Sequence, residues 1–167
     1  MTNAEQVAAN IVAREHMPVA QDVGDGAGVT FPGGQTKDWL EQWGLQPPTD
    51  EAEAVTNLQS WFAQSGLQVV INYSVELGDA LADFAYNSGG GLRTGVKAIQ
   101  TAVGVVSDGI IGAATLSAIS RQTPTRLSEI AKLVAKGRIH YVISQTRAGH
   151  IGLEFLDGLV ARALTFL

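Results

Sequence analysis

Apolar residues recur at helical spacing along almost the whole chain. The first stripe consists of Val7, Ala8, Ile11 and Val12 and ends near Pro18. Residues three and four positions apart share one face of a helix, so this stripe predicts an amphipathic helix with one buried side. The same spacing predicts further helices over 39–43, 47–66, 76–87, 94–104, 112–120, 123–142 and 155–164.

Residues at the ends of these stripes support the boundaries. Gly44 follows the second helix in the position where glycine commonly ends a helix. Thr49 is expected to cap the third helix, and Thr123 with Pro124 predicts the start of the long helix. The segment "LQVVINY" at 67–73 is rich in β-branched residues and favours either a short strand or a buried helical turn.

The chain contains no repeat, no low-complexity segment and no convincing linker. We therefore expect one all-α domain over residues 1–167, with a short β-hairpin allowed after the first helix. The chain has 167 residues, of which 46% are hydrophobic and 16% charged, a composition typical of a folded domain.

Charge and cysteine content exclude several kinds of function. The formal net charge is −5, which argues against a protein built to hold nucleic acid. Cysteine is absent, so neither disulfides nor thiolate metal sites can form. The histidines have no metal-ligand spacing, so we expect no metal, and no sequence fingerprint of an organic cofactor is present. The histidines are His16, His140 and His150.

The start of the chain does not resemble a secretory signal, because acidic residues precede basic ones and no continuous apolar core follows. No segment reaches the roughly 18 apolar residues that span a bilayer. We therefore expect a protein that is cytoplasmic as synthesised and does not insert stably into a membrane.

Glu15 breaks the pattern of the first helix. It lies four residues after Ile11 and eight after Val7, so it continues the apolar stripe. Apolar surroundings disfavour the charged form of a carboxyl group, which is how glycosidases keep a general acid protonated. The alternative is that the helix frays before Glu15 and the side chain turns into water, which Pro18 would favour.

A loop of aspartates and glycines follows, and it contains Asp22, Asp25 and then Thr30. Glycoside cleavage needs an acid on one side of the bond and a second group opposite it, acting as nucleophile or activating water. A glycine-rich hairpin folded over a helix end can present such a group. Aspartate among glycines is also ordinary turn chemistry, and this alternative stays open for each aspartate.

These residues resemble the pattern of phage-type lysozymes and, more closely, glycoside hydrolase family 108, the bacterial and phage N-acetylmuramidases. The segments "IVARE" and "DGAGVTFPGGQT" are similar to the family's glutamate and to its threonine and glycine loop. "LADFAYNSG" is similar to its middle helix, and "GVKAIQTAVGVVSDGIIGAATLSAI" to its peptidoglycan-binding region. "GRIHYV" and "EFLDGLVARA" are similar to its closing helices, where a tryptophan commonly stands at the position of Leu159.

The resemblance implies a lysozyme-like helical fold, with a catalytic portion at 1–90 and a peptidoglycan-binding-like portion at 91–167. It implies that Glu15 is the catalytic acid, that Asp25 or Asp22 is the loop carboxylate, and that Thr30 is the loop threonine. In phage-type lysozymes the carboxylate usually stands nine residues after the glutamate, where this chain has Gly24. Asp25 is one position beyond that point and Asp22 two positions before it.

The chain departs from the family beside the glutamate. There the family has two glycines and an aromatic residue, whereas this chain has His16, Met17 and Pro18. Larger side chains at this point could narrow the cleft, alter specificity or mark a member without activity. The alternative to a muramidase is therefore a non-catalytic peptidoglycan-binding or virion protein on the same scaffold.

Other residues could contact the sugar. Asn87 and Ser88 could line a cleft through their amide and hydroxyl, although helix capping also accounts for them. Trp39 could stack on a sugar ring, whereas helical spacing favours the core for Trp43 and Trp61. The turn at Asp108 and Gly109 favours a structural role over ligand contact.

For a muramidase, the expected partner is the peptidoglycan glycan strand. We expect a holin or secretion device to deliver it to the cell wall of the periplasm.

Overall fold

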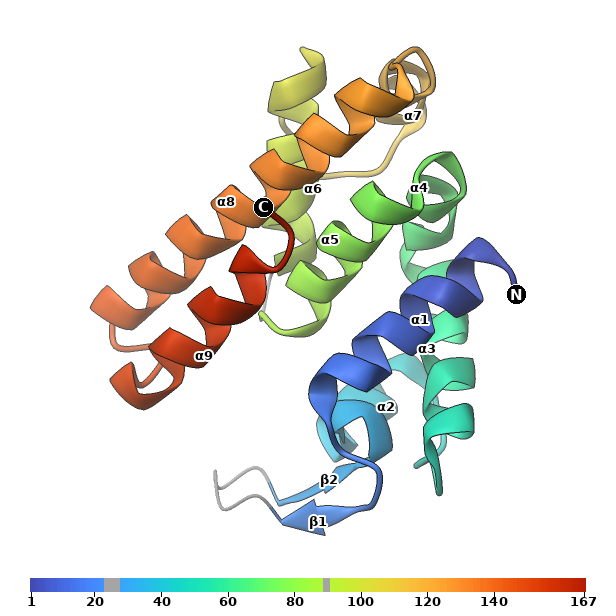
Figure 1. Cartoon of the computed structure of the whole chain (residues 1–167), viewed down its shortest axis with the longest axis vertical. Coiled ribbons are helices and arrows are strands. Elements are labelled where there is room, and N and C mark those ends of the chain that lie inside the picture. Colours follow the sequence, from blue (N-terminus) through green and yellow to red (C-terminus); the bar gives the residue numbers. More distant parts are fainter. Residues whose placement is uncertain (23–27, 89–90) are drawn as a thin grey trace. The chain divides into compact units, whose positions relative to one another are not determined.

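The structure is a computed structural model, and it describes residues 1–22, 28–88 and 91–167. Figure 1 shows a chain built mainly of helices. The described residues also form three short strands, which pair into one small sheet. The prediction of an essentially all-α fold with a short hairpin after the first helix is confirmed. The chain divides into two compact units, unit 1 over Met1–Gln68 and unit 2 over Val69–Leu167.

Unit 1 holds the first helices and the sheet. Its elements in chain order are α1 (Asn3–Glu15), β1 (Gln21–Asp22), β2 (Val29–Phe31), the 3-10 turn η1 (Pro32–Gly34), β3 (Gln35–Thr36), α2 (Lys37–Trp43) and α3 (Glu51–Ser65). The apolar faces of α1 and α3 pack against each other and bury Ile11, Leu58 and Phe62 completely. The buried stripe that the sequence predicts is therefore the face by which α1 packs.

Side-chain caps fix where these helices begin. Thr2 and Glu5 form a capping box at the start of α1, in which each side chain bonds the backbone N–H of the other residue. Asp50 caps α3 by accepting a hydrogen bond from the N–H of Glu53, so the predicted cap at Thr49 is wrong by one residue. Thr49 instead binds the carboxylate of Glu53 through its N–H and its hydroxyl.

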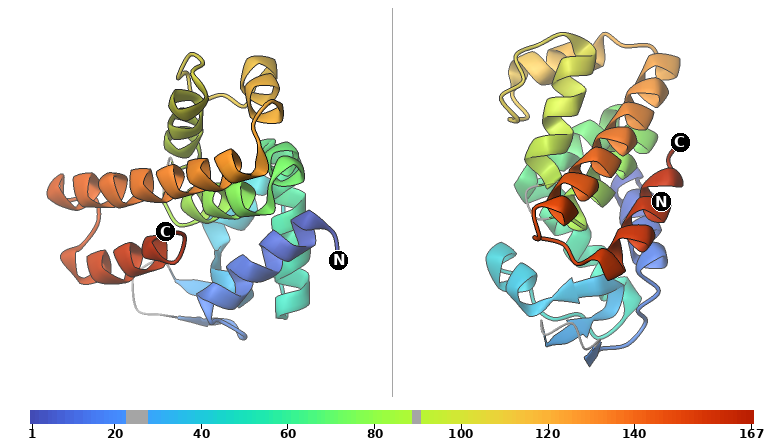
Figure 2. Two further views of the ribbon diagram at one scale, coloured as in Figure 1. Left: turned by 45° about the horizontal axis from the view of Figure 1, so that its top comes forward. Right: turned by 90° about the vertical axis from the view of Figure 1, so that its left-hand side faces the viewer.

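Unit 2 contains the remaining helices, and α4 crosses the division between the units. Its elements are α4 (Leu67–Tyr73), α5 (Val75–Tyr86), α6 (Gly91–Val103), α7 (Ala113–Ser120), α8 (Pro124–Arg147) and α9 (Leu153–Leu164). The ambiguous segment 67–73 is thus a helix. The long α8 contacts α5 and α6 and runs antiparallel to α9, as Figure 2 shows.

Thr123 and Pro124 start α8 as the sequence predicts, with the Thr123 hydroxyl accepting from the N–H of Arg126. The core of unit 2 is formed where α5, α6 and α8 meet. Leu81, Phe84 and Ile130 have no exposed surface there. Unit 2 therefore has an apolar centre of its own.

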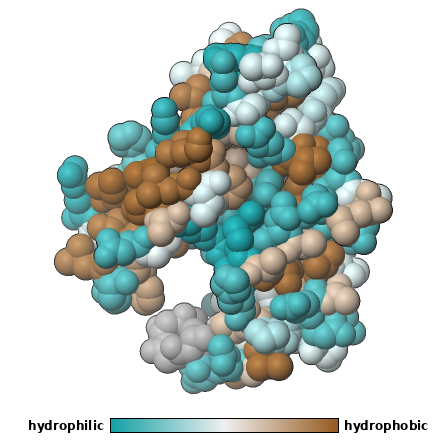
Figure 3. Space-filling view, in the orientation of Figure 1, coloured by the Kyte–Doolittle hydropathy of each residue, from teal (hydrophilic) through white to brown (hydrophobic). Residues whose placement is uncertain are grey.

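The last helix, α9, is much less buried than its neighbours. Ala163 is its only buried residue, whereas Leu153 is 76% exposed and Phe155 51%. Figure 3 shows the resulting apolar surface over the end of unit 2 where α8 and α9 lie. No helix in the described part of the chain has the length and apolar character needed to cross a membrane.

The division between the units falls between Gln68 and Val69 and describes packing. The predicted division of function, with a catalytic portion at 1–90 and a peptidoglycan-binding-like portion at 91–167, concerns ligands and stays a prediction.

Candidate active site

Glu15 is the last residue of α1, and the helix does not fray before it. His16 ends the helix in the left-handed conformation, with φ 51° and ψ 33°. Val7 and Ile11 on the same face are fully buried, and Glu15 itself is half-buried. The alternative in which the side chain turns freely into water is therefore wrong.

The carboxyl group of Glu15 lies against the glycine turn η1. A Cβ atom built on Gly34 would stand 2.7 Å from Oε2 of Glu15 and 2.8 Å from Cδ. The other carboxyl oxygen, Oε1, is removed from solvent. The turn is joined to the segment after α1, because the N–H of Gly33 donates to the carbonyl of Met17 over 2.9 Å. Helix end and turn together hold the carboxyl in place.

The small sheet places Thr30 and Asp22 on opposite faces. Its strand order is β1-β2-β3, with Thr30 directly opposite both Gln21 and Thr36, and Asp22 opposite Val29. Directly opposed residues share a face and neighbours along a strand alternate, so the side chain of Asp22 projects away from the face of Thr30. Thr30 is 6% exposed, whereas Asp22 is exposed. The two residues cannot act side by side on one bound sugar.

Asp25, the other candidate for the loop carboxylate, lies outside the described residues, which stop at Asp22 and resume at Gly28.

Gln35 is a supporting residue that sequence reasoning missed. Its side chain is fully buried; Nε2 donates to the carbonyl of Ala54 over 2.8 Å, and Oε1 accepts from Nδ2 of Asn57 over 2.8 Å. Asn57 also donates to the carbonyl of Gln46. These bonds tie β3, which follows directly after Gly34, to α3. A polar residue after two glycines carries no sequence signal of such burial.

Trp39 lies on α2 in an aromatic cluster. Its ring centroid is 5.7 Å from that of Trp61 in an edge-to-face arrangement, and Trp43 contacts Trp61 at 6.2 Å. Trp61 is 3% exposed, as predicted for a core residue, while Trp39 and Trp43 are half-buried. Trp39 therefore helps to pack unit 1, and sugar stacking by this residue stays a prediction.

Asn87 and Ser88 belong to unit 2, whereas Glu15 belongs to unit 1. Asn87 caps the end of α5, where both its backbone N–H and its Nδ2 donate to the carbonyl of Asp83 over 3.2 Å. This confirms the capping role. Ser88 is 5% exposed, and its hydroxyl has no hydrogen-bond partner among the described residues.

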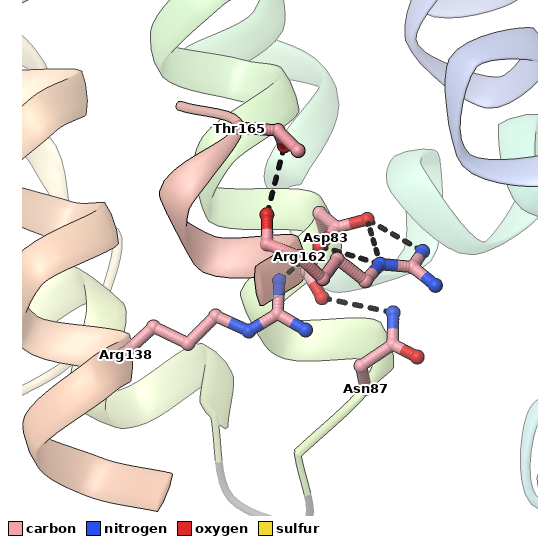
Figure 4. A network of polar contacts seen from close by, with 5 residues as sticks. All are labelled: Asp83, Asn87, Arg138, Arg162 and Thr165. Atoms are coloured by element: carbon pink, nitrogen blue, oxygen red, sulfur yellow. Dashed lines mark hydrogen bonds and ion pairs between the residues drawn. The ribbon is translucent and has the colours of Figure 1, made fainter. Parts of the chain in front are cut away.

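A buried ion cluster in unit 2 was also missed from sequence. Figure 4 shows Asp83 of α5 between two guanidinium groups, those of Arg138 on α8 and Arg162 on α9. Nη2 of Arg162 donates to Oδ1 of Asp83 over 2.6 Å, and Nη1 of Arg138 donates to Oδ2. Asp83 has no exposed surface, and Arg138 is 1% exposed. The cluster joins three helices, and its partners are 55 and 79 residues from Asp83 in sequence.

The turn at Asp108 is stabilised by hydrogen bonds within its own segment. The buried amide of Gln100 donates to Oδ1 of Asp108 and to the hydroxyl of Thr115, and it accepts from the N–H of Gly109. The hydrogen bond from Gln100 is the largest cause of a lowered pKa at Asp108, and the hydrogen bond from the N–H of Ile110 is the second. The carboxylate thus holds the turn together, which agrees with the predicted structural role.

Within residues 1–22, 28–88 and 91–167, no three histidine, aspartate or glutamate side chains gather closely enough to hold a metal ion. A pocket of about 210 Å³ lies in unit 1, lined by Gln46, Pro47, Pro48, Glu53, Thr56 and Asn57. Glu15 does not line it.

Comparison with known proteins gives a fold relationship. No protein-family model matches the sequence, and no curated protein sequence matches it. Among solved structures, SagA of Brucella abortus is similar, with a TM-score of 0.57 and 23% sequence identity over 98% of this chain and 94% of that chain. At this level of identity the likeness shows that the two chains share a fold over nearly their whole lengths.

Proposed function

We propose that this protein is a peptidoglycan hydrolase of the N-acetylmuramidase type, a member of glycoside hydrolase family 108. It would cleave the β-1,4 bond between N-acetylmuramic acid and N-acetylglucosamine. One observation carries the proposal: the half-buried carboxyl of Glu15 ends an apolar helix and lies on the glycine turn of the adjoining hairpin. The sequence resemblance supplies the substrate class.

In this mechanism Glu15 protonates the oxygen of the scissile glycosidic bond as the sugar leaves. A second group stabilises positive charge on the sugar ring or activates water, and no metal or organic cofactor takes part. Because Asp22 and Thr30 face opposite sides of the sheet, these two residues do not act on the same water. If Asp22 is the second group, it acts without Thr30.

A non-catalytic peptidoglycan-binding or virion protein is the second candidate, and His16 favours it. In the family a glycine stands next to the glutamate, whereas here an imidazole does. His16 takes the left-handed conformation that glycine adopts most readily. With Met17 and Pro18, this side chain stands where the family has two glycines and an aromatic residue, and it distinguishes this chain beside its candidate acid.

The deciding experiment incubates the purified full chain with peptidoglycan sacculi and identifies soluble fragments by mass spectrometry. Glu15→Gln removes the acid, and Glu41→Gln is the matched control, because Glu41 is an exposed glutamate of the same unit whose carboxylate forms a surface ion pair with Lys37. Muramic-acid reducing ends from wild type and Glu41→Gln, but not from Glu15→Gln, would support the muramidase. Sedimentation with sacculi but no release by any variant would favour the binding protein.

The proposal extends to the site of action. The substrate lies in the cell wall, so the protein would act in the periplasm after delivery by a holin or a secretion device. Cell fractionation that shows export without either would contradict this part alone.

A further inference from the structure

The space beside Gly34 is occupied by Glu15. The three atoms nearest to a Cβ built on Gly34 are Oε2, Cδ and Cγ of Glu15, at 2.7, 2.8 and 2.9 Å. Real Cβ atoms essentially never come that close to another heavy atom, so a side chain at position 34 and the present place of the carboxyl exclude each other. Gly34 also has φ 74°, which favours glycine for conformational reasons.

The neighbouring glycine serves a different purpose. A Cβ on Gly33 would meet Cβ of Ala54 at 3.0 Å and Cγ2 of Val12 at 3.1 Å. These atoms belong to the core between α1 and α3, so Gly33 allows the turn to pack. The three atoms nearest to a Cβ on Gly34 all belong to the Glu15 side chain, so the two glycines can be separated by experiment.

Hydrogen bonds fix the turn on both sides of Gly34. The N–H of Gly33 donates to the carbonyl of Met17, and the Gln35 amide donates to Ala54 through Nε2 and accepts from Asn57 through Oε1. The carboxyl is the end of a side chain with three rotatable bonds. A methyl group at position 34 would therefore move the carboxyl and leave the turn in place. A displacement of about 1 Å at a catalytic group can cost about 10²-fold in rate.

We infer that Gly34 is a positioning residue. Because it has no side chain, it leaves the space in which the Glu15 carboxyl lies in the orientation used for proton donation. This inference rests on the proposed function of Glu15 for its catalytic consequence. The contact between Gly34 and Glu15 does not depend on that function. It can therefore be tested separately from its effect on catalysis.

The test compares Gly34→Ala with Gly66→Ala. Gly66 also lies in unit 1 and has φ 81°, but a Cβ there would have no atom within 4 Å. Both variants thus carry the strain of alanine at positive φ, and only Gly34→Ala crowds Glu15. We expect Gly34→Ala to lower kcat on peptidoglycan about 10²-fold with little change in KM, and Gly66→Ala to stay within about twofold of wild type.

Nuclear magnetic resonance provides a readout besides activity. In the wild type an Overhauser contact is expected between the α-protons of Gly34 and the γ-protons of Glu15. The carboxyl carbon resonance of Glu15 should shift in Gly34→Ala and stay in place in Gly66→Ala. Absence of that contact, or an unmoved Glu15 resonance in Gly34→Ala, would overturn the inference whether or not the protein is an enzyme.

The kinetic result separates the remaining cases. If wild type cleaves peptidoglycan, Glu15→Gln is inactive and Gly34→Ala keeps full kcat, the positioning role is refuted while the proposed function stands. If wild type does not cleave peptidoglycan but the Glu15 resonance shifts as expected, the proposed function fails, and the contact between Gly34 and the Glu15 carboxyl is confirmed.

Discussion

Asp83 of α5 holds Arg162 of α9 through both of its carboxylate oxygens, across 79 residues of sequence. Arg138 of α8 binds the same carboxylate from a fully buried position. These bonds join α9 to α5, in addition to the packing of α9 along α8.

The first prediction concerns the loss of this carboxylate. Asp83→Asn leaves two arginines side by side without their anion, and we expect it to lower the free energy of unfolding by about 3–5 kcal/mol. Glu129→Gln is the control, because Glu129 forms an ion pair with Arg126 in the same unit but is 56% exposed. That exposed pair should contribute at most about 1 kcal/mol. Urea unfolding followed by circular dichroism measures both, and equal losses would contradict the prediction.

The second prediction concerns His16, a non-glycine residue at φ 51°. Because a side chain in the left-handed region costs about 1–2 kcal/mol, His16→Gly should stabilise unit 1 by about 1 kcal/mol. Arg14→Gly lies inside the same helix and should instead destabilise it by about 1 kcal/mol. The tryptophans Trp39, Trp43 and Trp61 all lie in unit 1, so their fluorescence during urea unfolding reports on this unit. If His16→Gly is instead less stable than the wild type, the imidazole makes a contact that stabilises the fold by more than the left-handed backbone conformation costs.

The third prediction concerns Gln35. Gln35→Leu removes the amide that bonds Ala54 and Asn57, and buried groups left without partners cost about 1–3 kcal/mol each. We therefore expect a loss of about 2 kcal/mol or more, measured by tryptophan fluorescence in urea. Gln42→Leu, at an exposed position of α2, is the control and should change stability by less than about 0.5 kcal/mol.

The fourth prediction follows from the lowered pKa of Asp108. Hydrogen bonds from Gln100 and from the N–H of Ile110 favour the ionised carboxyl in the folded state, so the folded pKa lies below the unfolded value of 3.8. The resulting stabilisation is complete above the unfolded pKa and is lost as the pH falls through the folded pKa. In Gln100→Leu the pKa of Asp108 should rise toward 3.8. Titration of the carboxyl carbon by nuclear magnetic resonance in both proteins would show this, and an unchanged pKa would contradict it.

The helices could be predicted from local sequence signals, because caps and apolar stripes act over a few residues. Thr123 with Pro124 marks the start of α8, and Gly44 marks the end of α2. The cap of α3 was misplaced because Thr49 and Asp50 are both good capping residues, and only the structure shows which one meets the helix. The β-branched segment at 67–73 is a helix because burial of Val70 and Ile71 outweighs its local preference.

The candidate site was predictable only in part. The position of Glu15 on the apolar face follows from helical spacing alone. Its contact with Gly34 does not, because the turn returns to the helix end only in three dimensions. Likewise nothing in the sequence pairs Asp83 with arginines far along the chain, since ion pairs between distant helices leave no periodic pattern.

The distance in sequence between Asp83 and its arginines also affects when unit 2 can fold during synthesis. At about 5–20 residues per second, the ribosome adds Arg162 about 4–16 s after Asp83. For the first 55 residues of that interval neither partner arginine has been made, and from then until Arg162 is added only Arg138 can pair with the carboxylate. Unit 2 is therefore expected to complete its folding late, after α9 has been made, and a ribosome that stalls before Arg162 would hold a chain with this carboxylate incompletely neutralised.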